Sequence, residues 1–508
     1  MSKGIMLQGT ASNVGKSILA TAFCRIFAQD GYKVAPFKSW NMALNSYVTK
    51  SGGEIGRAQA VQADAAGIEI EEKMQPILVK PKGEGIAQII VKGKAIGDFR
   101  ADRKSREYIE WALETIENSL ADLSNEFEIL VLEGAGSPAE INIKDQDIAN
   151  MKVAKLNQTP VLLVADIDRG GALASVVGTL KLLEPKERRL VKGIILNKFR
   201  GDYDLLKPGI DILEEKTGKK VVGVIPYCKD FKIPNEDSLS LDSFRKQEGE
   251  IKIGIIKLPH ISNFSDFDVL AYEPEVEVEY LSANDSLKNY DLIIIPGTKN
   301  TTADLNYLEE TGLAGRIINY AKRGKAIVGI CGGYQILGKR LLDPNLTEGN
   351  IREIKGLALL DVETVFSQNK LTYQTKAIVE GKEGFLKSLT EQEFEVYEIH
   401  AGDSRLGSEA NHMFKITSRS EEEVDIMEGA CSQDGLVWGT YLHGIFDNDR
   451  FRRAFINQLR KKKGLDELRK ESTVSKERLE ESYDQLAQIV RENIDLKLIY
   501  DILEEGEF

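Results

Sequence analysis

Short runs of consecutive apolar residues alternate with longer segments of helical spacing through the first half of the chain. The runs are rich in Val, Ile and Leu, and they fall at 5–7, 34–37, 129–132, 161–164, 193–196 and 221–225. A strand that is apolar on both faces is buried on both faces, as the strands of parallel sheets are. The pattern therefore predicts an α/β fold with a parallel sheet in residues 1–232.

A second series of the same kind begins at Ile251, with runs at 251–256, 291–295, 326–330 and 436–442. Polar and charged residues separate the two series, which is typical of a linker. After residue 453 come charged segments whose apolar positions have helical spacing. The sequence thus predicts an α/β domain over 1–232, a linker over 233–250, a second α/β domain over 251–453 and a helical tail over 454–508.

Composition narrows the possible functions. The chain has 508 residues, 42% of them apolar, and a formal net charge of −13. Such a balance argues against broad nucleic-acid binding, which requires positive charge against phosphate. No apolar run is long enough for a membrane span and no signal-peptide pattern is present, so we expect a cytoplasmic protein without a membrane partner. The four cysteines and four histidines show no metal-binding spacing, so any divalent ion would have oxygen ligands.

The segment GTASNVGKS at 9–17 separates the first apolar run from a segment of helical spacing. A glycine-rich loop in this position binds phosphate with the backbone N–H groups at the start of the helix. Lys16 would balance the charge of the β- and γ-phosphates, and Ser17 would coordinate Mg²⁺. The residues expected to bind ATP are Gly9, Thr10, Gly15, Lys16 and Ser17. The loop is one residue longer than the usual P-loop, and this form resembles dethiobiotin synthetase and its ATP-dependent relatives.

Two acidic residues end apolar runs of the first series. Glu133 follows the run at 129–132, and Asp166 follows the run at 161–164 after one alanine. Open parallel sheets bind ligands at the carboxyl ends of their strands. Either carboxylate is therefore a candidate ligand of Mg²⁺ beside Ser17, and capping of the next helix is the alternative for each.

Cys331 lies in the segment GICGGYQ at 329–335, between an apolar run and a helix-like segment. Glycines on both sides permit the sharp strand-to-helix turn that exposes a nucleophile and directs N–H groups at an oxyanion. His443 follows a later apolar run, and a Cys/His pair can attack an amide to form a thioester. The GxCxGxQ pattern resembles class I glutamine amidotransferases, which implies a second domain of that fold and glutamine as the source of ammonia. We predict Cys331 and His443 as the catalytic residues.

The surroundings of His443 differ from the common pattern of that class. Many class I enzymes follow this histidine with Pro and Glu, and the glutamate orients the imidazole. Gly444 and Ile445 occupy those places here, so the sequence does not identify the group that orients His443. The turn 296–300 is a candidate donor to the oxyanion, with an ordinary turn as the alternative. His400 also resembles a family motif, and a structural histidine is the alternative there.

Five further segments make the chain similar to the cobyric acid synthase family of cobalamin biosynthesis over residues 1–455. They are KSWNMALNS at 38–46, EIGRAQA at 54–60, EGAGSPAE at 133–140, DIDRGG at 166–171 and LPHISNFSDFD at 258–268. The resemblance implies a ligase that uses ATP and glutamine to amidate the b, d, e and g carboxylates of adenosylcobyrinic acid a,c-diamide, giving adenosylcobyric acid. It implies an acyl phosphate intermediate and a sheltered path for ammonia. Lys38, Arg57 and Arg169 are plausible partners of the polycarboxylate.

Three other functions are compatible with parts of this pattern. Cobyrinic acid a,c-diamide synthase has both domains, but aspartates are expected there in place of the segment 38–46. A partitioning-type ATPase switch with a degenerate second domain is the second alternative, and intact Cys331 and His443 argue against it. A cysteine hydrolase is the third, and it gives the phosphate loop no purpose.

Overall fold

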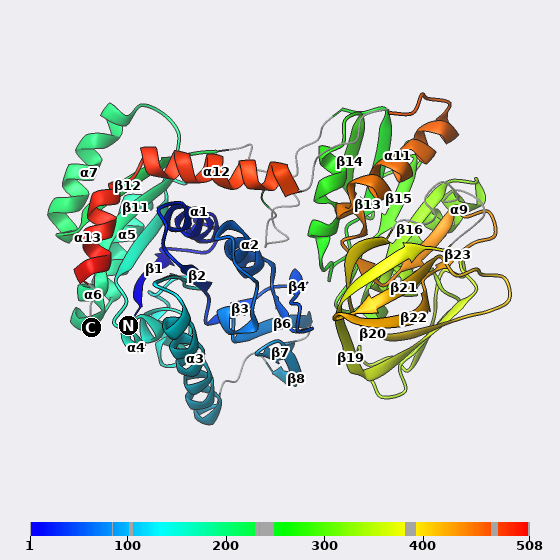
Figure 1. Cartoon of the computed structure of the whole chain (residues 1–508), viewed down its shortest axis with the longest axis horizontal. Coiled ribbons are helices and arrows are strands. Elements are labelled where there is room, and N and C mark those ends of the chain that lie inside the picture. Colours follow the sequence, from blue (N-terminus) through cyan, green and yellow to red (C-terminus); the bar gives the residue numbers. More distant parts are fainter. Residues whose placement is uncertain are drawn as a thin grey trace.

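A computed structural model of the protein describes residues 2–83, 85–100, 105–228, 233, 248–380, 393–468 and 476–505. It shows two α/β domains (Figure 1). The expected linker, 233–250, lies outside the described residues apart from Ile233 and 248–250, so it stays a prediction. No helix in the described ranges is long and apolar enough to cross a membrane.

The first domain is built on a six-stranded sheet in which every neighbouring pair is parallel. In sheet order the strands are β12 (Lys220–Pro226), β11 (Val191–Phe199), β10 (Val161–Asp166), β1 (Lys3–Gly9), β9 (Ile129–Glu133) and β2 (Val34–Phe37). Every residue of β9 and β10 is buried. The six apolar runs of the first series form these strands, so the predicted parallel sheet is confirmed.

Helices pack on both faces of this sheet. Their bounds are α1 (Lys16–Gln29), α2 (Arg57–Ala65), α3 (Arg106–Glu126), α4 (Met151–Leu156), α5 (Ala172–Leu182), α6 (Pro185–Leu190) and α7 (Tyr203–Thr217). Successive residues of β1 belong to opposite cores, because side chains alternate along a strand. Met6 shares its core with α3, α4 and α5, whereas Ile5 and Leu7 share theirs with α1.

The last two described helices return to the first domain. Tyr483 and Val490 of α12 (Lys476–Glu492) share a core cluster with Phe23 of α1, and so do apolar residues of α13 (Leu496–Glu505). Figure 1 shows α12 running alongside α1. In contrast, α11 (Asp449–Lys463) packs on the second domain, where the ring of Phe455 lies 5.7 Å from that of Trp438. The residues expected as one helical tail therefore divide between the two domains.

Two small sheets extend the first domain toward the second (Figure 1). One has the order β3 (Trp40–Met42), β6 (Ile77–Gly83), β7 (Ile86–Val91) and β8 (Lys94–Arg100). The other is the pair β4 (Ser46–Val48) and β5 (Glu54–Gly56). The apolar pattern of the sequence predicted neither sheet.

The second domain has its own six-stranded sheet, parallel except at β23. In order its strands are β14 (Val276–Leu281), β13 (Ile251–Ile256), β15 (Leu292–Ile295), β16 (Ala326–Ile330), β24 (Val437–Thr440) and β23 (Ala430–Cys431). The helices beside it include α8 (Thr301–Glu310), α9 (Leu313–Lys322) and α10 (Gly332–Leu337). The second α/β series of the sequence is thereby confirmed.

A further, largely antiparallel sheet completes the second domain. Its strands are β18 (Glu353–Lys355), β17 (Arg340–Leu342), β19 (Val362–Val379), β20 (Glu393–Leu406) and β25 (Leu442–His443), with β21 (Phe414–Arg419) and β22 (Glu422–Glu428) added beside β19. This sheet brings β25, which carries His443, next to β20.

Candidate active site

The phosphate loop runs from the end of β1 to the start of α1. The loop ends at Gly15, whose φ of 98° favours glycine. A Cβ at Gly15 would lie 2.1 Å from the side-chain nitrogen of Asn197, and one at Gly9 would lie 2.9 Å from Nζ of Lys16. Close packing therefore requires glycine at both positions.

Lys16 folds back over this loop. Its Nζ donates to the carbonyl of Ala11 at 3.4 Å and to that of Gly136 at 3.3 Å. From the end of β11, Asn197 and Lys198 donate to other carbonyls of the loop at 2.8 and 2.6 Å. The loop is thus held from two sides, with an ammonium group at the start of a helix, where phosphate binds well.

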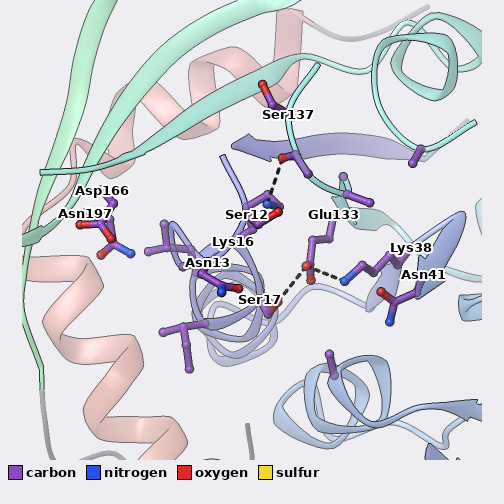
Figure 2. Close-up of a pocket in the computed structure, with 18 of the residues that line it drawn as sticks. Ser12, Asn13, Lys16, Ser17, Lys38, Asn41, Glu133, Ser137, Asp166 and Asn197 are labelled. Atoms are coloured by element: carbon purple, nitrogen blue, oxygen red, sulfur yellow. Dashed lines mark hydrogen bonds and ion pairs between the residues drawn. The ribbon is translucent and has the colours of Figure 1, made fainter. Parts of the chain in front are cut away.

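Ser17 and Glu133 meet beside the loop (Figure 2). The hydroxyl of Ser17 donates to Oε1 of Glu133 at 2.8 Å, and Nζ of Lys38 lies 2.9 Å from the same oxygen. Gln62 donates to the other carboxylate oxygen at 2.7 Å. Burial raises the pKa of Glu133, but the charges of Lys38 and Lys16 outweigh it and lower that pKa, so the carboxylate is ionised at neutral pH.

Asp166 lies apart from this pair. Its Oδ2 accepts a hydrogen bond from Lys198 at 2.8 Å, and Nε of Arg169 lies 3.6 Å away. Figure 2 shows Asp166 beside Asn197, with the loop between it and Glu133. Of the predicted metal ligands, the structure therefore brings Ser17 and Glu133 together and leaves Asp166 on the other side of the loop.

One cavity of 1710 Å³ extends from the phosphate loop to the second domain. Its wall includes Lys16, Glu133 and the segment 40–44, and it reaches Phe264 of η4 (Phe264–Tyr272). Its volume exceeds the roughly 300–1,000 Å³ of a pocket for one small molecule. The cavity can therefore hold a nucleotide together with a larger second ligand.

The wall of this cavity combines apolar and cationic side chains. Met42 and Ile143 line it and are each 48% exposed. Lys144 and Arg169 line it as well. Such a wall suits a ligand that has apolar faces and carboxylates at its rim.

Cys331 lies in the turn between β16 and α10. Its φ of 52° and ψ of −111° are rare for a residue other than glycine. A Cβ at Gly333 would lie 1.9 Å from the carbonyl oxygen of Ile295, and one at Gly332 would lie 2.5 Å from Cγ2 of Thr298. The two glycines let the turn after β15 pack directly against the elbow, which explains the place of Gly333 in the GxCxGxQ pattern.

His443 is buried beside Cys331, and a carboxylate holds it. Its Nδ1 lies 2.6 Å from Oδ2 of Asp266, a residue of η4. Burial lowers the pKa of His443, but the charge and hydrogen bond of Asp266, together with the Cys331 thiol, raise it to about 10. The imidazole is therefore protonated at neutral pH and can donate a proton to a leaving group.

Tyr397 and Asn263 complete the surroundings of His443. Tyr397 is its partner across the strands; the two rings stack at 5.1 Å, and the hydroxyl of Tyr397 donates to Oδ1 of Asp266 at 3.2 Å. The side-chain nitrogen of Asn263 lies 3.3 Å from that hydroxyl and 3.5 Å from Nδ1 of His443. The sequence had not assigned these three residues a role, although Asp266 and Asn263 belong to the segment 258–268.

The turn 296–300 lies against both predicted catalytic residues. A Cβ at Gly297 would lie 3.4 Å from Cε1 of His443. A Cβ at Gly332, the neighbour of Cys331, would lie 3.1 Å from the backbone nitrogen of Thr298. The role of this turn as an oxyanion donor stays a prediction.

His400 borders the site from β20. Its ring stacks on that of Tyr441 with centroids 3.8 Å apart, and its Nδ1 lies 2.8 Å from the carbonyl oxygen of Gly402. The thiol of Cys331 lies 3.5 Å from the carbonyl oxygen of Ile399. His400 thus packs against Tyr441 and bonds to its own strand, next to the residue whose carbonyl lies near the thiol, and the choice between a structural and a catalytic histidine stays a prediction.

In comparisons with known proteins, two different family models match the two parts of the chain. Residues 5–241 match the family model of the CobQ/CobB/MinD/ParA nucleotide binding domain, and residues 252–451 match that of the CobB/CobQ-like glutamine amidotransferase domain. The chain is 49% identical to a cobyric acid synthase of Desulforamulus reducens over 100% of this chain and 99% of the relative. It is 51% identical to that of Dehalococcoides mccartyi strain BAV1 over 100% of both. It is 49% identical to that of Carboxydothermus hydrogenoformans over 99% of this chain and 100% of the relative.

Proposed function

Because the chain belongs to the cobyric acid synthase family of amidating ligases, we propose that it uses ATP and glutamine to amidate the b, d, e and g carboxylates of adenosylcobyrinic acid a,c-diamide. The product is adenosylcobyric acid. One observation carries this proposal: the wall of the cavity at the phosphate loop includes Phe264, which belongs to the same short helix that supplies Asp266 to His443. Two sites that share one helix suit a reaction in which one site makes what the other consumes.

Ammonia is released in the second domain. The Cys331 sulfur attacks the side-chain carbonyl of glutamine, and the turn 296–300 donates to the oxyanion. The imidazolium of His443 protonates the leaving nitrogen, so that ammonia departs and a γ-glutamyl thioester remains. Water then cleaves the thioester to glutamate and restores the thiol.

The carboxylate is activated in the first domain. A carboxylate oxygen attacks the γ-phosphorus of ATP, which gives an acyl phosphate and ADP, and ammonia displaces phosphate to form the amide. Lys16 balances the phosphate charge, as a loop lysine does in phosphoryl transfer. The hydroxyl of Ser17 and the ionised carboxylate of Glu133 suit a hard cation, and we assign them to Mg²⁺. When bound, Mg²⁺ would neutralise phosphate charge.

Mass spectrometry tests the substrate and the nitrogen source together. Adenosylcobyrinic acid a,c-diamide is incubated with enzyme, ATP, Mg²⁺ and glutamine, and the expected result is a set of successive losses of about 1 Da, one for each amidation. Cobyrinic acid, offered in parallel, separates this activity from that of an a,c-diamide synthase. An unchanged corrinoid mass while glutamate still accumulates would contradict the proposed substrate.

Asp266→Asn is expected to lower kcat/KM for glutamine hydrolysis by roughly 10⁴-fold, the loss seen when the carboxylate of a catalytic triad is neutralised. Asp266 raises the pKa of His443 to about 10, so losing its charge lowers that pKa. The imidazolium is then lost at a lower pH, and the alkaline limb of the pH profile of hydrolysis moves down.

The measurement is the rate of glutamate release between pH 6 and 10. Glu310→Gln removes an exposed carboxylate of α8 in the same domain and is the matched control, with a profile like that of the wild type. An unshifted alkaline limb in Asp266→Asn would contradict the role of Asp266.

Glu133→Gln is expected to raise the Mg²⁺ concentration needed for half-maximal amidation by at least about 10-fold, because a metal ligand is lost. The measurement is the Mg²⁺ concentration for half-maximal amidation with ammonium chloride as nitrogen donor. Asp166→Asn serves as the comparison and is expected to leave that concentration unchanged. The opposite ranking of the two variants would assign the metal to Asp166.

A further inference from the structure

The first domain reaches the surroundings of His443 through the turn between β3 and β4. The side-chain oxygen of Asn45 accepts a hydrogen bond from the backbone N–H of Phe264 at 3.0 Å. In return, the backbone N–H of Ser46 donates to the side-chain oxygen of Asn263 at 3.1 Å. All four residues are buried. These reciprocal bonds fix the turn against the start of η4.

Asn263, which accepts the hydrogen bond from Ser46, also contacts the imidazole of His443. The side-chain nitrogen of Asn263 lies 3.5 Å from Nδ1 of His443, and its backbone has a φ of 51°, which few residues adopt unless neighbouring groups fix it. The next residue of the turn, Tyr47, has its ring 6.2 Å from that of Tyr397, which stacks on His443. Displacing the turn therefore displaces two neighbours of the imidazole.

Arg57 ties the same turn to the charges around the site. Its backbone N–H donates to the carbonyl of Asn45 at 3.2 Å, and its guanidinium lies 5.8 Å from the centre of the Tyr47 ring. Burial raises the pKa of Asp268 to about 7 and that of Asp447 to about 6, and the charge of Arg57 opposes both increases. A cation of the first domain thus faces carboxylates of the second.

The other end of this segment belongs to the large cavity. Residues 40–44 line the cavity, and β3 is held in the small sheet by pairing with β6. The backbone N–H of Ala43 donates to the carbonyl of Val79 at 3.1 Å. A single stretch, 40–46, therefore has one end in the wall of the cavity and the other end bonded to the neighbours of His443.

We infer that Asn45 is a positioning residue of the second domain's active site. By holding Phe264, and with it the start of η4, Asn45 keeps Asp266 and Asn263 where they fix the imidazole of His443. The inference rests on the proposed function, in which Cys331 and His443 hydrolyse glutamine. Its consequence is that the amide synthetase domain contributes to the rate of a reaction that takes place entirely in the other domain.

Asn45→Ala tests this inference in the full-length enzyme. We expect kcat/KM for glutamine hydrolysis to fall by roughly 10²-fold, the effect of misplacing a catalytic group by about 1 Å. Amidation with ammonium chloride is expected to stay within about two-fold of the wild type, because no reacting group of the first domain is changed. The alkaline limb of the hydrolysis profile moves to lower pH, because the contact of Asp266 with His443 is loosened.

Lys82→Ala is the matched control. It also removes a hydrogen bond between the domains, that of Nζ of Lys82 with the carbonyl oxygen of Thr347 at 2.6 Å, and Thr347 belongs neither to η4 nor to the turn 296–300. The backbone carbonyl of Lys82, which accepts a hydrogen bond from Asn300, is kept. We expect its hydrolysis rate and its pH profile to equal those of the wild type. Equal losses in the two variants would mean that Asn45 acts only through docking of the domains, and would overturn the inference.

The outcomes also separate this inference from the proposed function. A wild-type enzyme that releases no glutamate from glutamine would refute the function itself. Normal release by the wild type and by Asn45→Ala alike would refute the positioning role alone. Loss of both hydrolysis and ammonium-dependent amidation in Asn45→Ala would show general misfolding. Asn45→Ser, which keeps a shorter hydrogen-bond acceptor, is then the deciding variant. The inference stands if Asn45→Ser regains ammonium-dependent amidation while its glutamine hydrolysis stays low, and falls if both activities return together.

Discussion

Cys331→Ala is expected to lower amidation with glutamine by about 10⁴-fold or more, the size of loss that follows removal of a catalytic nucleophile. Amidation with ammonium chloride is expected to continue at nearly the wild-type rate, because the synthetase site in the first domain is intact. The strained backbone of Cys331, with φ of 52°, presents this thiol at the start of α10 beside a protonated His443. The measurement is corrinoid amidation followed with each nitrogen source in turn.

Cys431→Ala is the matched control, since Cys431 is a second thiol of the same domain and lies in β23. It is expected to amidate normally with glutamine. Substantial glutamine-dependent activity in Cys331→Ala would remove the thioester from the mechanism. Failure with both nitrogen sources would show instead that the two domains cannot be uncoupled.

Lys16→Ala is expected to lower amidation by roughly 10²–10³-fold with either nitrogen source, the effect of removing one preorganised group from a developing charge. Glutamine hydrolysis without nucleotide is expected to continue, because Lys16 lies in the phosphate loop of the first domain, whereas Cys331 and His443 lie in the second domain. Amidation is expected to fall because Nζ of Lys16 is held in the phosphate loop, within 3.4 Å of the carbonyl oxygens of Ala11 and Gly136.

Amidation and hydrolysis are measured side by side in this variant. Lys181→Ala, an exposed lysine of α5, is the control and is expected to match the wild type in both. Full amidation by Lys16→Ala would place the nucleotide elsewhere. Together, the variants at Cys331 and Lys16 are expected to lose opposite halves of the reaction.

The main sheets were predictable from the sequence because their strands are buried on both faces and therefore read as unbroken apolar runs. In the small sheets, β3, β4, β5 and β8 lacked that signal. Every residue of β8 is exposed, and β3, β4 and β5 have three residues each. Strand β19 has 18 residues, many of them polar; buried positions alternate with less buried ones at its two ends, and its middle is half-buried or exposed. Such strands are stabilised by pairing with neighbours that the sequence alone does not identify.

The candidate site, like the fold, could be predicted from the sequence only in part. The phosphate loop and the cysteine elbow are contiguous, so their glycines and reactive groups could be found from local spacing. The bond of His443 to Asp266 joins residues 177 positions apart, and no local pattern indicates it. Glu133 and Asp166 end strands on opposite sides of β1, so position at a strand end could not separate them. The phosphate loop passes between the two carboxylates in the folded chain, and only this arrangement shows that Glu133, and not Asp166, lies beside Ser17.

The return of α12 and α13 to the first domain sets an order for folding during synthesis. A ribosome makes residues 476–505 only after the whole second domain. Tyr483 and Val490 then join the core of α1, and Leu486 and Ile489 add the last part of the cavity wall. The cavity beside the phosphate loop is therefore completed only after the second domain has been made, so that a half-made chain lacks part of the wall of this pocket.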